Sequence, residues 1–242
     1  MTMTAPEPTA LAELIKAKIQ ALRFQPDHEE IVARMEQEER RKKQRQQLLA
    51  AGIPDANLNA NGIEFDNQQR ASLRMIWESI AGFSSHGKVW IVTGSRGAGK
   101  TTMVCRLLAS WITKSKGHAR YSKLSDLLEL QVLYSGQGVA EKQQKHALQQ
   151  RDRFANHNSL LAIDEVHENR SNANAAEILV DLVDRRYSAG RHTVLISNLE
   201  PENLEDCINP SILDRARDGG GIVSTMGWTN YRIEKAKGET AA

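Results

Sequence analysis

A glycine-rich run at 94–102, GSRGAGKTT, holds the residues of this sequence that are best suited to chemistry. It fits the P-loop pattern G-x-x-x-x-G-K-[ST], in which successive backbone N–H groups point at phosphate oxygens. In that pattern Lys100 reaches the β- and γ-phosphate oxygens, and the hydroxyl of Thr101 binds Mg²⁺. We therefore expect a nucleotide and Mg²⁺ at this loop; a glycine-rich surface turn is the alternative. The residues predicted to hold the nucleotide are Gly94, Ser95, Arg96, Gly97, Ala98, Gly99, Lys100, Thr101 and Thr102.

Two later apolar runs end in polar residues that suit the same chemistry. The run 160–163 is followed by Asp164 and Glu165. A carboxylate at the end of a strand adjoining the P-loop strand can hold Mg²⁺, and Asp164 fits that role. Glu165 is suited to orient water for attack on the γ-phosphate. Asn198 follows the run 193–196, where a polar side chain would contact the γ-phosphate and the attacking water; an ordinary strand-end turn is the alternative.

Two arginines near the end of the sequence are further candidates. Arg215 is suited to complete the site of a neighbouring subunit, because an arginine supplied in this way accelerates phosphoryl transfer. A surface ion pair with Asp214 or Asp218 is its alternative role. Arg232 either reaches the γ-phosphate or faces solvent.

Strands and helices that alternate along the chain must bring these residues together. The β-branched, apolar run 88–93 predicts a strand before the P-loop, and 102–111 predicts a helix whose dipole favours phosphate. Further strands are predicted at 119–124, 159–163 and 193–196, and further helices at 66–83, 125–134, 139–155, 172–189 and after Pro210. This alternation is typical of an α/β fold, a parallel sheet sandwiched by helices.

The amino-terminal part of the sequence predicts two helices, 9–23 and 28–51. The first carries an apolar stripe at helical spacing that includes Leu11, Leu14, Ile15 and Leu22. The second is charged at 36–45, which fits either a basic arm for nucleic acid or a solvated helix with ion pairs four residues apart. Gly, Pro and Asn residues after it are typical of a linker. The predicted domains are a small helical domain at 1–51, a linker at 52–65 and a nucleotide-binding domain at 66–242.

The composition excludes several classes of protein. With 242 residues, 40% of them hydrophobic, the chain can bury one full core, and a net charge of +2 favours no particular partner. Its 2 cysteines are too few for a metal site or a disulfide framework, and Cys105 is expected to be a buried apolar residue. Because no run has transmembrane length and the amino terminus lacks the features of a secretion signal, we expect a soluble, cytoplasmic protein without membrane contacts.

The order of these motifs resembles that of the AAA+ ATPases, and within them the bacterial helicase loaders of the DnaC and DnaI type; the IstB-type ATPase partners of transposases share the same core. The segments that carry the resemblance are AGIP at 51–54, LAIDE at 161–165, VDRR at 183–186, ISNL at 196–199, ILDRAR at 212–217 and GWTNYR at 227–232. The resemblance implies that Asn198 is the sensor 1 residue, Arg215 the arginine finger and Arg232 a sensor 2 candidate. The sequence departs from the family at Arg96, where a small residue or Pro is usual, and at His167, where Gly is frequent.

The resemblance implies an ATP-dependent loader that binds a hexameric, DnaB-type replicative helicase and delivers it onto single-stranded DNA. About ten residues follow Arg232, too few for the helical lid of many AAA+ proteins. We therefore expect a P-loop AAA+ sheet without a lid domain, a weak ATPase that is stimulated by assembly or DNA, and self-association into a spiral. The stripe Leu11, Leu14, Ile15 and Leu22 would bind the helicase, or would pack back onto the nucleotide-binding domain.

Single-stranded DNA would run along the inside of such a spiral. The residues predicted to contact it are Lys114, Lys116, Arg120, Tyr121 and Lys123, although lysines at helix ends also serve the helix dipole. Two other functions share the P-loop. One is an IstB-like ATPase helper of a transposase, which would bind duplex DNA and recruit its partner. The other is a small-molecule kinase, which would need an arginine-bearing lid and no water-orienting Glu165.

Overall fold

The computed structural model describes most of the chain. The described residues are 26–58, 64–82, 85–115, 117–136, 139–156, 159–167 and 173–226, together with Glu13 and Trp228. The chain divides into two compact units, Met1–Gln47 and Leu48–Ala242. No helix among these residues is both long and apolar enough to cross a membrane.

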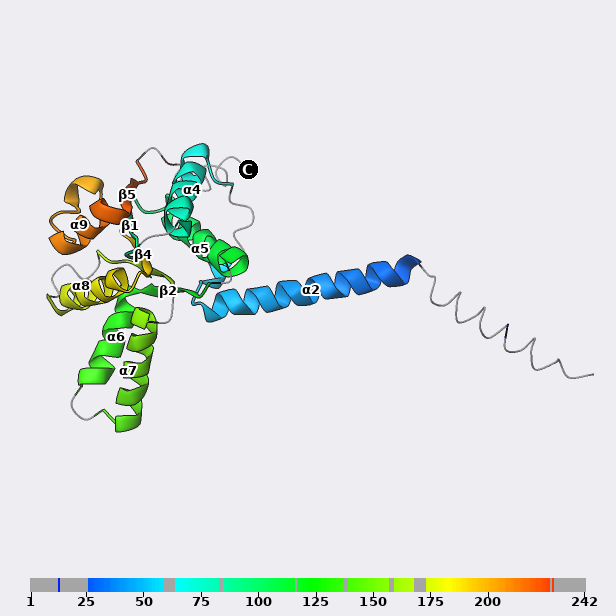
Figure 1. Cartoon of the computed structure of the whole chain (residues 1–242), viewed down its shortest axis with the longest axis horizontal. Coiled ribbons are helices and arrows are strands. Elements are labelled where there is room, and N and C mark those ends of the chain that lie inside the picture. Colours follow the sequence, from blue (N-terminus) through cyan, green and yellow to red (C-terminus); the bar gives the residue numbers. More distant parts are fainter. Residues whose placement is uncertain are drawn as a thin grey trace, which may run out of the picture. The chain divides into compact units, whose positions relative to one another are not determined.

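Apart from Glu13, the described part of the first unit belongs to helix α2 (Pro26–Ala50), which confirms the helix predicted at 28–51 (Figure 1). Glu36 and Arg40 lie 3.6 Å apart, one of the ion pairs that the charge spacing predicts. Both side chains are largely exposed, so the pair stabilises the helix by about 0.5 kcal/mol at most. The predicted helix 9–23 and its apolar stripe lie outside the described residues, apart from Glu13.

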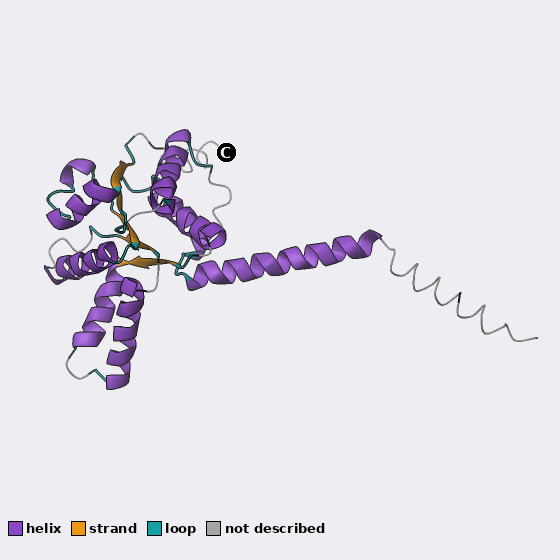
Figure 2. Ribbon diagram, in the orientation of Figure 1, coloured by secondary structure: helices purple, strands orange, loops and turns teal. Residues whose placement is uncertain are grey.

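A parallel sheet forms the centre of the second unit (Figure 2). Its strands are β1 (Val89–Thr93), β2 (Ala119–Lys123), β3 (Leu160–Asp164), β4 (His192–Ile196) and β5 (Gly221–Ser224). The strand order is β2-β3-β4-β1-β5, and every pairing is parallel. This order corrects one expectation: the strand that ends in Asp164 does not adjoin the P-loop strand, because β4 lies between them.

Helices cover both faces of this sheet, as the alternation of elements predicts. The helical elements of this unit, apart from the end of α2, are α3 (Asp55–Leu58), α4 (Asn67–Ala81), α5 (Lys100–Ser110), the π-helical turn η1 (Trp111–Ser115), α6 (Leu124–Ser135), α7 (Glu141–Asn156), α8 (Ala173–Ser188), the 3₁₀ turn η2 (Pro201–Asn203) and α9 (Pro210–Gly219). Helices α4 and α5 pack on one face, and α6 to α9 pack on the other.

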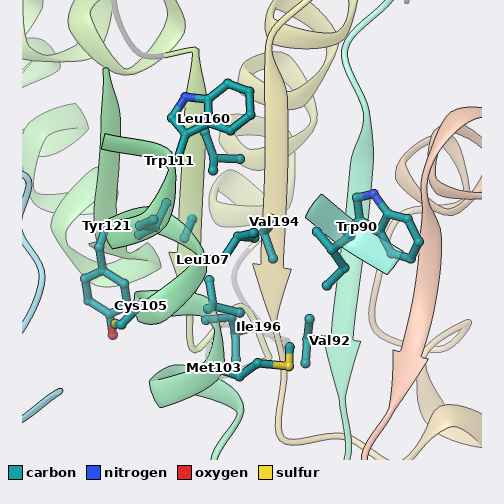
Figure 3. Close-up of a cluster of buried hydrophobic side chains, with 14 of the residues drawn as sticks. Trp90, Val92, Met103, Cys105, Leu107, Trp111, Tyr121, Leu160, Val194 and Ile196 are labelled. Atoms are coloured by element: carbon teal, nitrogen blue, oxygen red, sulfur yellow. The ribbon is translucent and has the colours of Figure 1, made fainter. Parts of the chain in front are cut away.

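Successive strand residues point to opposite faces and so fill two separate cores. In β1, Trp90 and Val92 belong to the core beneath α4 and α5, whereas Val89 and Ile91 belong to the core beneath α6 to α9. Figure 3 shows the first of these cores, where α5 side chains meet those of the strands. Cys105 lies within it, and burial raises the pKa of its thiol to about 12, which confirms the expected apolar role.

The segment that the sequence predicts as a linker contributes to the second unit. Ile53 and Phe65 are buried in the core beneath α4 and α5. Gly52 has φ +79°, and a Cβ at this position would lie 2.4 Å from the carbonyl oxygen of Tyr121. Only glycine therefore allows the chain to pass so close to β2, where the amide of Tyr121 donates to the carbonyl oxygen of Ala51 at 2.8 Å.

Candidate nucleotide-binding site

The P-loop connects β1 to α5 through three glycines with left-handed backbones. Gly94, Gly97 and Gly99 have φ values of 127°, 87° and 82°. A Cβ on Gly94 would lie 2.1 Å from the Oγ1 atom of Thr225, so this position has no room for a side chain. Gly99 precedes α5, and no side chain caps this helix. The first amides of α5 are therefore directed at the loop, as anion binding at a helix N-terminus requires.

Lys100 begins α5 and is folded back against the loop. Its side chain is only 4% exposed. The Nζ atom donates to the carbonyl oxygens of Gly94 and Ser95, both at 2.7 Å. A buried ammonium group held by neutral carbonyls attracts anions strongly, because the surroundings screen its charge less than water does.

Asp164, at the carboxyl end of β3, is the centre of a hydrogen-bond network. Its Oδ2 atom accepts from the Thr101 hydroxyl and from the Tyr121 hydroxyl, each at 2.8 Å. Its Oδ1 atom accepts from the amide of Glu165 at 2.7 Å. Burial and the Asp164 carboxylate raise the pKa of Tyr121, so this hydroxyl stays protonated and remains a donor. The predicted pair of Mg²⁺ ligands, Thr101 and Asp164, is thus brought into direct contact.

Glu165 has a backbone conformation that non-glycine residues seldom adopt. Its φ is 60°, and among the described residues it is the one non-glycine residue with a positive φ. The left-handed conformation costs roughly 1–2 kcal/mol, and such strain is concentrated at functional sites. The Oε2 atom of Glu165 lies 2.9 Å from the Nζ atom of Lys123, at the end of β2. The proposed water-orienting carboxylate is therefore ion-paired in this structure.

Asn198 follows β4, the strand between the P-loop strand and the strand of the acid pair. The preceding amide, of Ser197, donates to the carbonyl oxygen of Val92 in β1 at 2.9 Å. On the other side, the amide of Asn198 donates to the Nδ1 atom of His167 at 3.1 Å. The chain at 197–198 is thus anchored to β1 on one side and to the loop after β3 on the other.

These side chains line one cavity of about 540 Å³. Its lining residues are Pro54, Asn57, Arg96, Gly97, Gly99, Lys100, Thr101, Thr102, Tyr121, Lys123, Asp164, Glu165 and Asn198. Most of the residues predicted for the nucleotide, for Mg²⁺ and for the attacking water are therefore brought together. The sequence did not assign Pro54 or Asn57 to the site, since both lie in the predicted linker. Asn57 accepts from the Thr102 hydroxyl at 2.9 Å and so connects α3 to the P-loop helix.

The predicted arginines lie elsewhere. Arg215, on α9, is not among the residues that line the cavity. It forms an ion pair of 2.9 Å with Asp184 on α8, rather than with Asp214 or Asp218, and its guanidinium lies 5.6 Å from the centre of the Tyr187 ring. Arg232 lies outside the described residues.

Among the residues that the structure describes, those predicted to contact DNA do not form one surface. The prediction for Tyr121 is wrong, because its ring is buried in the core and its hydroxyl is bonded to Asp164. Arg120 points to the opposite face of β2, with its guanidinium 5.1 Å from the centre of the Phe154 ring. Lys123 forms an ion pair with Glu165 in the lining of the cavity. Lys114 is exposed to solvent. Lys116 lies outside the described residues.

The donors at the cavity fit a nucleoside triphosphate with Mg²⁺. Lys100 is a buried cation at the start of α5, where the first helix amides can also donate, and both suit the negative charge of the phosphates. The hydroxyl of Thr101 and the carboxylate of Asp164 are oxygen ligands, the type that Mg²⁺ prefers. ATP and Mg²⁺ are therefore compatible with the residues present.

A comparison with protein families decides where the chain belongs. The family model described as IstB-like ATP binding protein matches residues 8–237. The chain belongs to this family. The predicted likeness to the IstB-type ATPase core is thereby confirmed, together with the ATP-binding character of the family.

Curated relatives of this IstB-like chain include two proteins named replicative helicase loader DnaC. The one from Buchnera aphidicola subsp. Acyrthosiphon pisum is 26% identical over 174 residues, which cover 70% of this chain and 66% of that protein. The one from Escherichia coli strain K12 is 22% identical over 170 residues, with the same shares of 70% and 66%. The match thus spans slightly less than two thirds of the length of these relatives.

Solved structures confirm the fold. The crystal structure of the DnaC helicase loader superimposes with a TM-score of 0.58 at 16% identity, over 71% of this chain and 99% of that one. The crystal structure of DnaI gives a TM-score of 0.53 at 17% identity, over 74% and 93%. The IstB-like chain therefore has the P-loop AAA+ fold that the sequence predicts.

Proposed function

We propose that this IstB-like chain is an ATPase that converts ATP and water to ADP and phosphate. The observation that carries the proposal is the direct contact between Thr101 and Asp164, which joins the two halves of the site in one cavity. Lys100 would bind the β- and γ-phosphates, and Glu165 would orient the attacking water. Asn198 would donate to the γ-phosphate. Mg²⁺ held by Thr101 and Asp164 would neutralise phosphate charge.

Two variants separate binding from hydrolysis. We expect Lys100→Ala to abolish ATP binding, measured by titration calorimetry, because the buried cation is lost. Glu165→Gln should retain binding but release phosphate at least about 10²-fold more slowly, because a general base contributes on that order. Lys142→Ala, on the exposed surface of α7, is the matched control and should match wild type. Hydrolysis at the wild-type rate by Glu165→Gln would contradict the assigned role, and a wild-type chain that binds no ATP would contradict the proposal itself.

We further propose that the ATPase loads a hexameric, DnaB-type replicative helicase onto single-stranded DNA, with assembly into a spiral and stimulation by assembly or DNA. The support is that the curated relatives are named replicative helicase loaders and that the fold is shared with DnaC and DnaI. The helical segment 1–51 would bind the helicase through Leu11, Leu14, Ile15 and Leu22, which lie outside the described residues. Exposed Lys114, together with Lys116, would contribute to DNA binding.

Co-purification with a ring helicase, with and without ATP, tests this second proposal. We expect wild type to retain the helicase and Leu14→Glu to lose it, since a charge in the apolar stripe opposes helix-in-groove binding. Glu13→Gln, an exposed neighbour, should behave as wild type. Recovery of a transposase and no helicase would favour the IstB-like helper instead. A phosphorylated small-molecule product would favour a kinase.

A further inference from the structure

His167 makes two contacts with a single residue. Its Nδ1 atom accepts a hydrogen bond from the backbone amide of Asn198 at 3.1 Å. Its Nε2 atom lies 3.3 Å from the Nδ2 atom of the same residue. His167 thus contacts both the backbone and the side chain of Asn198. It lies in the loop that follows Asp164 and Glu165.

The first contact fixes the protonation of the ring. An Nδ1 atom that accepts from a backbone N–H cannot carry a proton, so a neutral imidazole must carry it on Nε2. The Nε2–H group is then a donor directed at the amide of Asn198. Two donors repel each other, and the oxygen and nitrogen of a side-chain amide are told apart by their hydrogen bonds. We therefore assign the amide the reverse orientation, with Oδ1 rather than Nδ2 facing His167. Its NH₂ group then lies on the side away from the imidazole.

This orientation has a consequence for the nucleotide cavity, which Asn198 lines. Phosphate oxygens only accept hydrogen bonds, so an amide oxygen turned toward a γ-phosphate would repel it, whereas an NH₂ group would bind it. We propose that His167 is a positioning residue that holds the amide of Asn198 with its NH₂ group available to the γ-phosphate. This inference rests on the proposed ATPase function and adds a residue to it.

The surrounding backbone makes His167 well placed for this task. The amide of Val166 donates to the carbonyl oxygen of Ile196 at 3.2 Å, which ties the loop after β3 to the end of β4. Asp164 and Glu165 directly precede Val166, and Asn198 follows Ile196 by two residues. His167 therefore couples the position of the acid pair to the orientation of Asn198.

The tautomer can be measured without nucleotide. Long-range ¹H–¹⁵N spectra of the full chain, with His167→Gln used to assign the signals, report which ring nitrogen carries the proton. We expect the Nε2–H form for His167. A signal for the Nδ1–H form, or for rapid exchange between the two, would overturn the inference regardless of whether the protein hydrolyses ATP.

Kinetics and affinities supply the second test. We expect His167→Ala to lower kcat about tenfold, as expected for a misplaced group that stabilises the transition state, with ADP affinity within about twofold of wild type. His167→Asn should restore most of the rate, because its amide oxygen can replace Nδ1 as the acceptor for the backbone amide, and its NH₂ group can replace Nε2–H as the donor to the Asn198 side chain. The matched control is His146→Ala, since exposed His146 contacts the amide of Gln150 at the same 3.3 Å but lies on α7.

The outcomes are distinct. A wild-type rate in His167→Ala, equal losses in the Ala and Asn variants, or a parallel loss of ADP affinity would each overturn the positioning role. If wild type itself hydrolyses no ATP, the ATPase proposal fails, and the tautomer alone then decides whether His167 orients Asn198.

Discussion

Glu165 and Lys123 form an ion pair at the mouth of the nucleotide cavity. The side chains are 30% and 47% exposed, respectively. An ion pair this open to water contributes about 0–1 kcal/mol, because solvent screens it and holding both side chains costs entropy. Lys123 therefore restrains Glu165 weakly, and releasing the carboxylate requires little free energy.

Removing the Lys123 side chain should change the rate of ATP hydrolysis. We expect Lys123→Ala to raise the basal ATPase rate of the isolated chain by at most about fivefold, the factor that corresponds to 1 kcal/mol. Steady-state phosphate release measures it. Lys145→Ala is the matched control, because Lys145 forms an exposed ion pair of 2.7 Å with Glu141 far along α7. A slower Lys123→Ala variant would show instead that Lys123 assists the reaction.

Among the features of the site, the side chains of the P-loop and of the strand ends were the easiest to predict from the sequence. Lys100, Thr101, Asp164 and Asn198 could be assigned from sequence because each lies in a short local pattern. The partners of these residues could not be assigned in the same way. Tyr121 lies 43 positions before Asp164 and meets it only because β2 pairs with β3, which no local pattern indicates.

At the scale of elements, α4 supports the P-loop through Gln69. This side chain is fully buried, and its Nε2 atom donates to the carbonyl oxygen of Ala98 at 3.0 Å. Its Oε1 atom accepts from the backbone amide of Asp66, and the Oδ1 atom of Asp66 accepts from the backbone amide of Gln69. The capping-box spacing of Asp66 and Gln69 is visible in the sequence, but the hydrogen bond from the Gln69 side chain to the P-loop is not.

Gln69→Ala should therefore weaken both stability and nucleotide binding. It leaves the carbonyl of Ala98 without this donor and removes half of the capping box, which together should cost about 1–3 kcal/mol. Thermal unfolding would show a midpoint lower by several degrees, about 2–4 °C per kcal/mol for a domain of this size. ATP affinity should fall with it. Gln68→Ala, an exposed neighbour on α4, should leave both unchanged, and a Gln69→Ala chain with wild-type stability would refute this role.

The strands and helices were predicted more reliably than their arrangement. Periodicity and apolar runs located four strands, because β1, β3 and β4 are buried along their whole length and β2 is buried at most of its positions. β5 was missed, since its residues Gly221–Ser224 are only partly buried and begin with glycine. The predicted linker was drawn from Gly and Pro content alone, which cannot distinguish a flexible connection from Gly52 packed tightly against β2.

At the scale of the whole molecule, Arg215 is held within its own subunit. Asp184 forms an ion pair with it, and its Nη1 atom donates to the carbonyl oxygen of Ser211 at 2.7 Å. The side chain is 25% exposed, and its ion pair joins α9 to α8. It does not line the cavity of its own chain. We therefore expect any contribution of Arg215 to hydrolysis to be made at the site of another copy.

A mixing experiment tests this arrangement. Arg215→Ala chains keep a complete cavity but lack the arginine, whereas Lys100→Ala chains keep the arginine but cannot bind ATP. If Arg215 acts on a neighbouring subunit, each variant alone should be inactive, and an equal mixture should regain about a quarter of the wild-type phosphate release, because about one interface in four then combines an intact cavity with an intact arginine. Arg215→Lys serves as the folding control, since it retains the charge beside Asp184 but lacks the planar guanidinium. A mixture as inactive as its components, with both variants folded and assembled, would exclude a role for Arg215 across the interface.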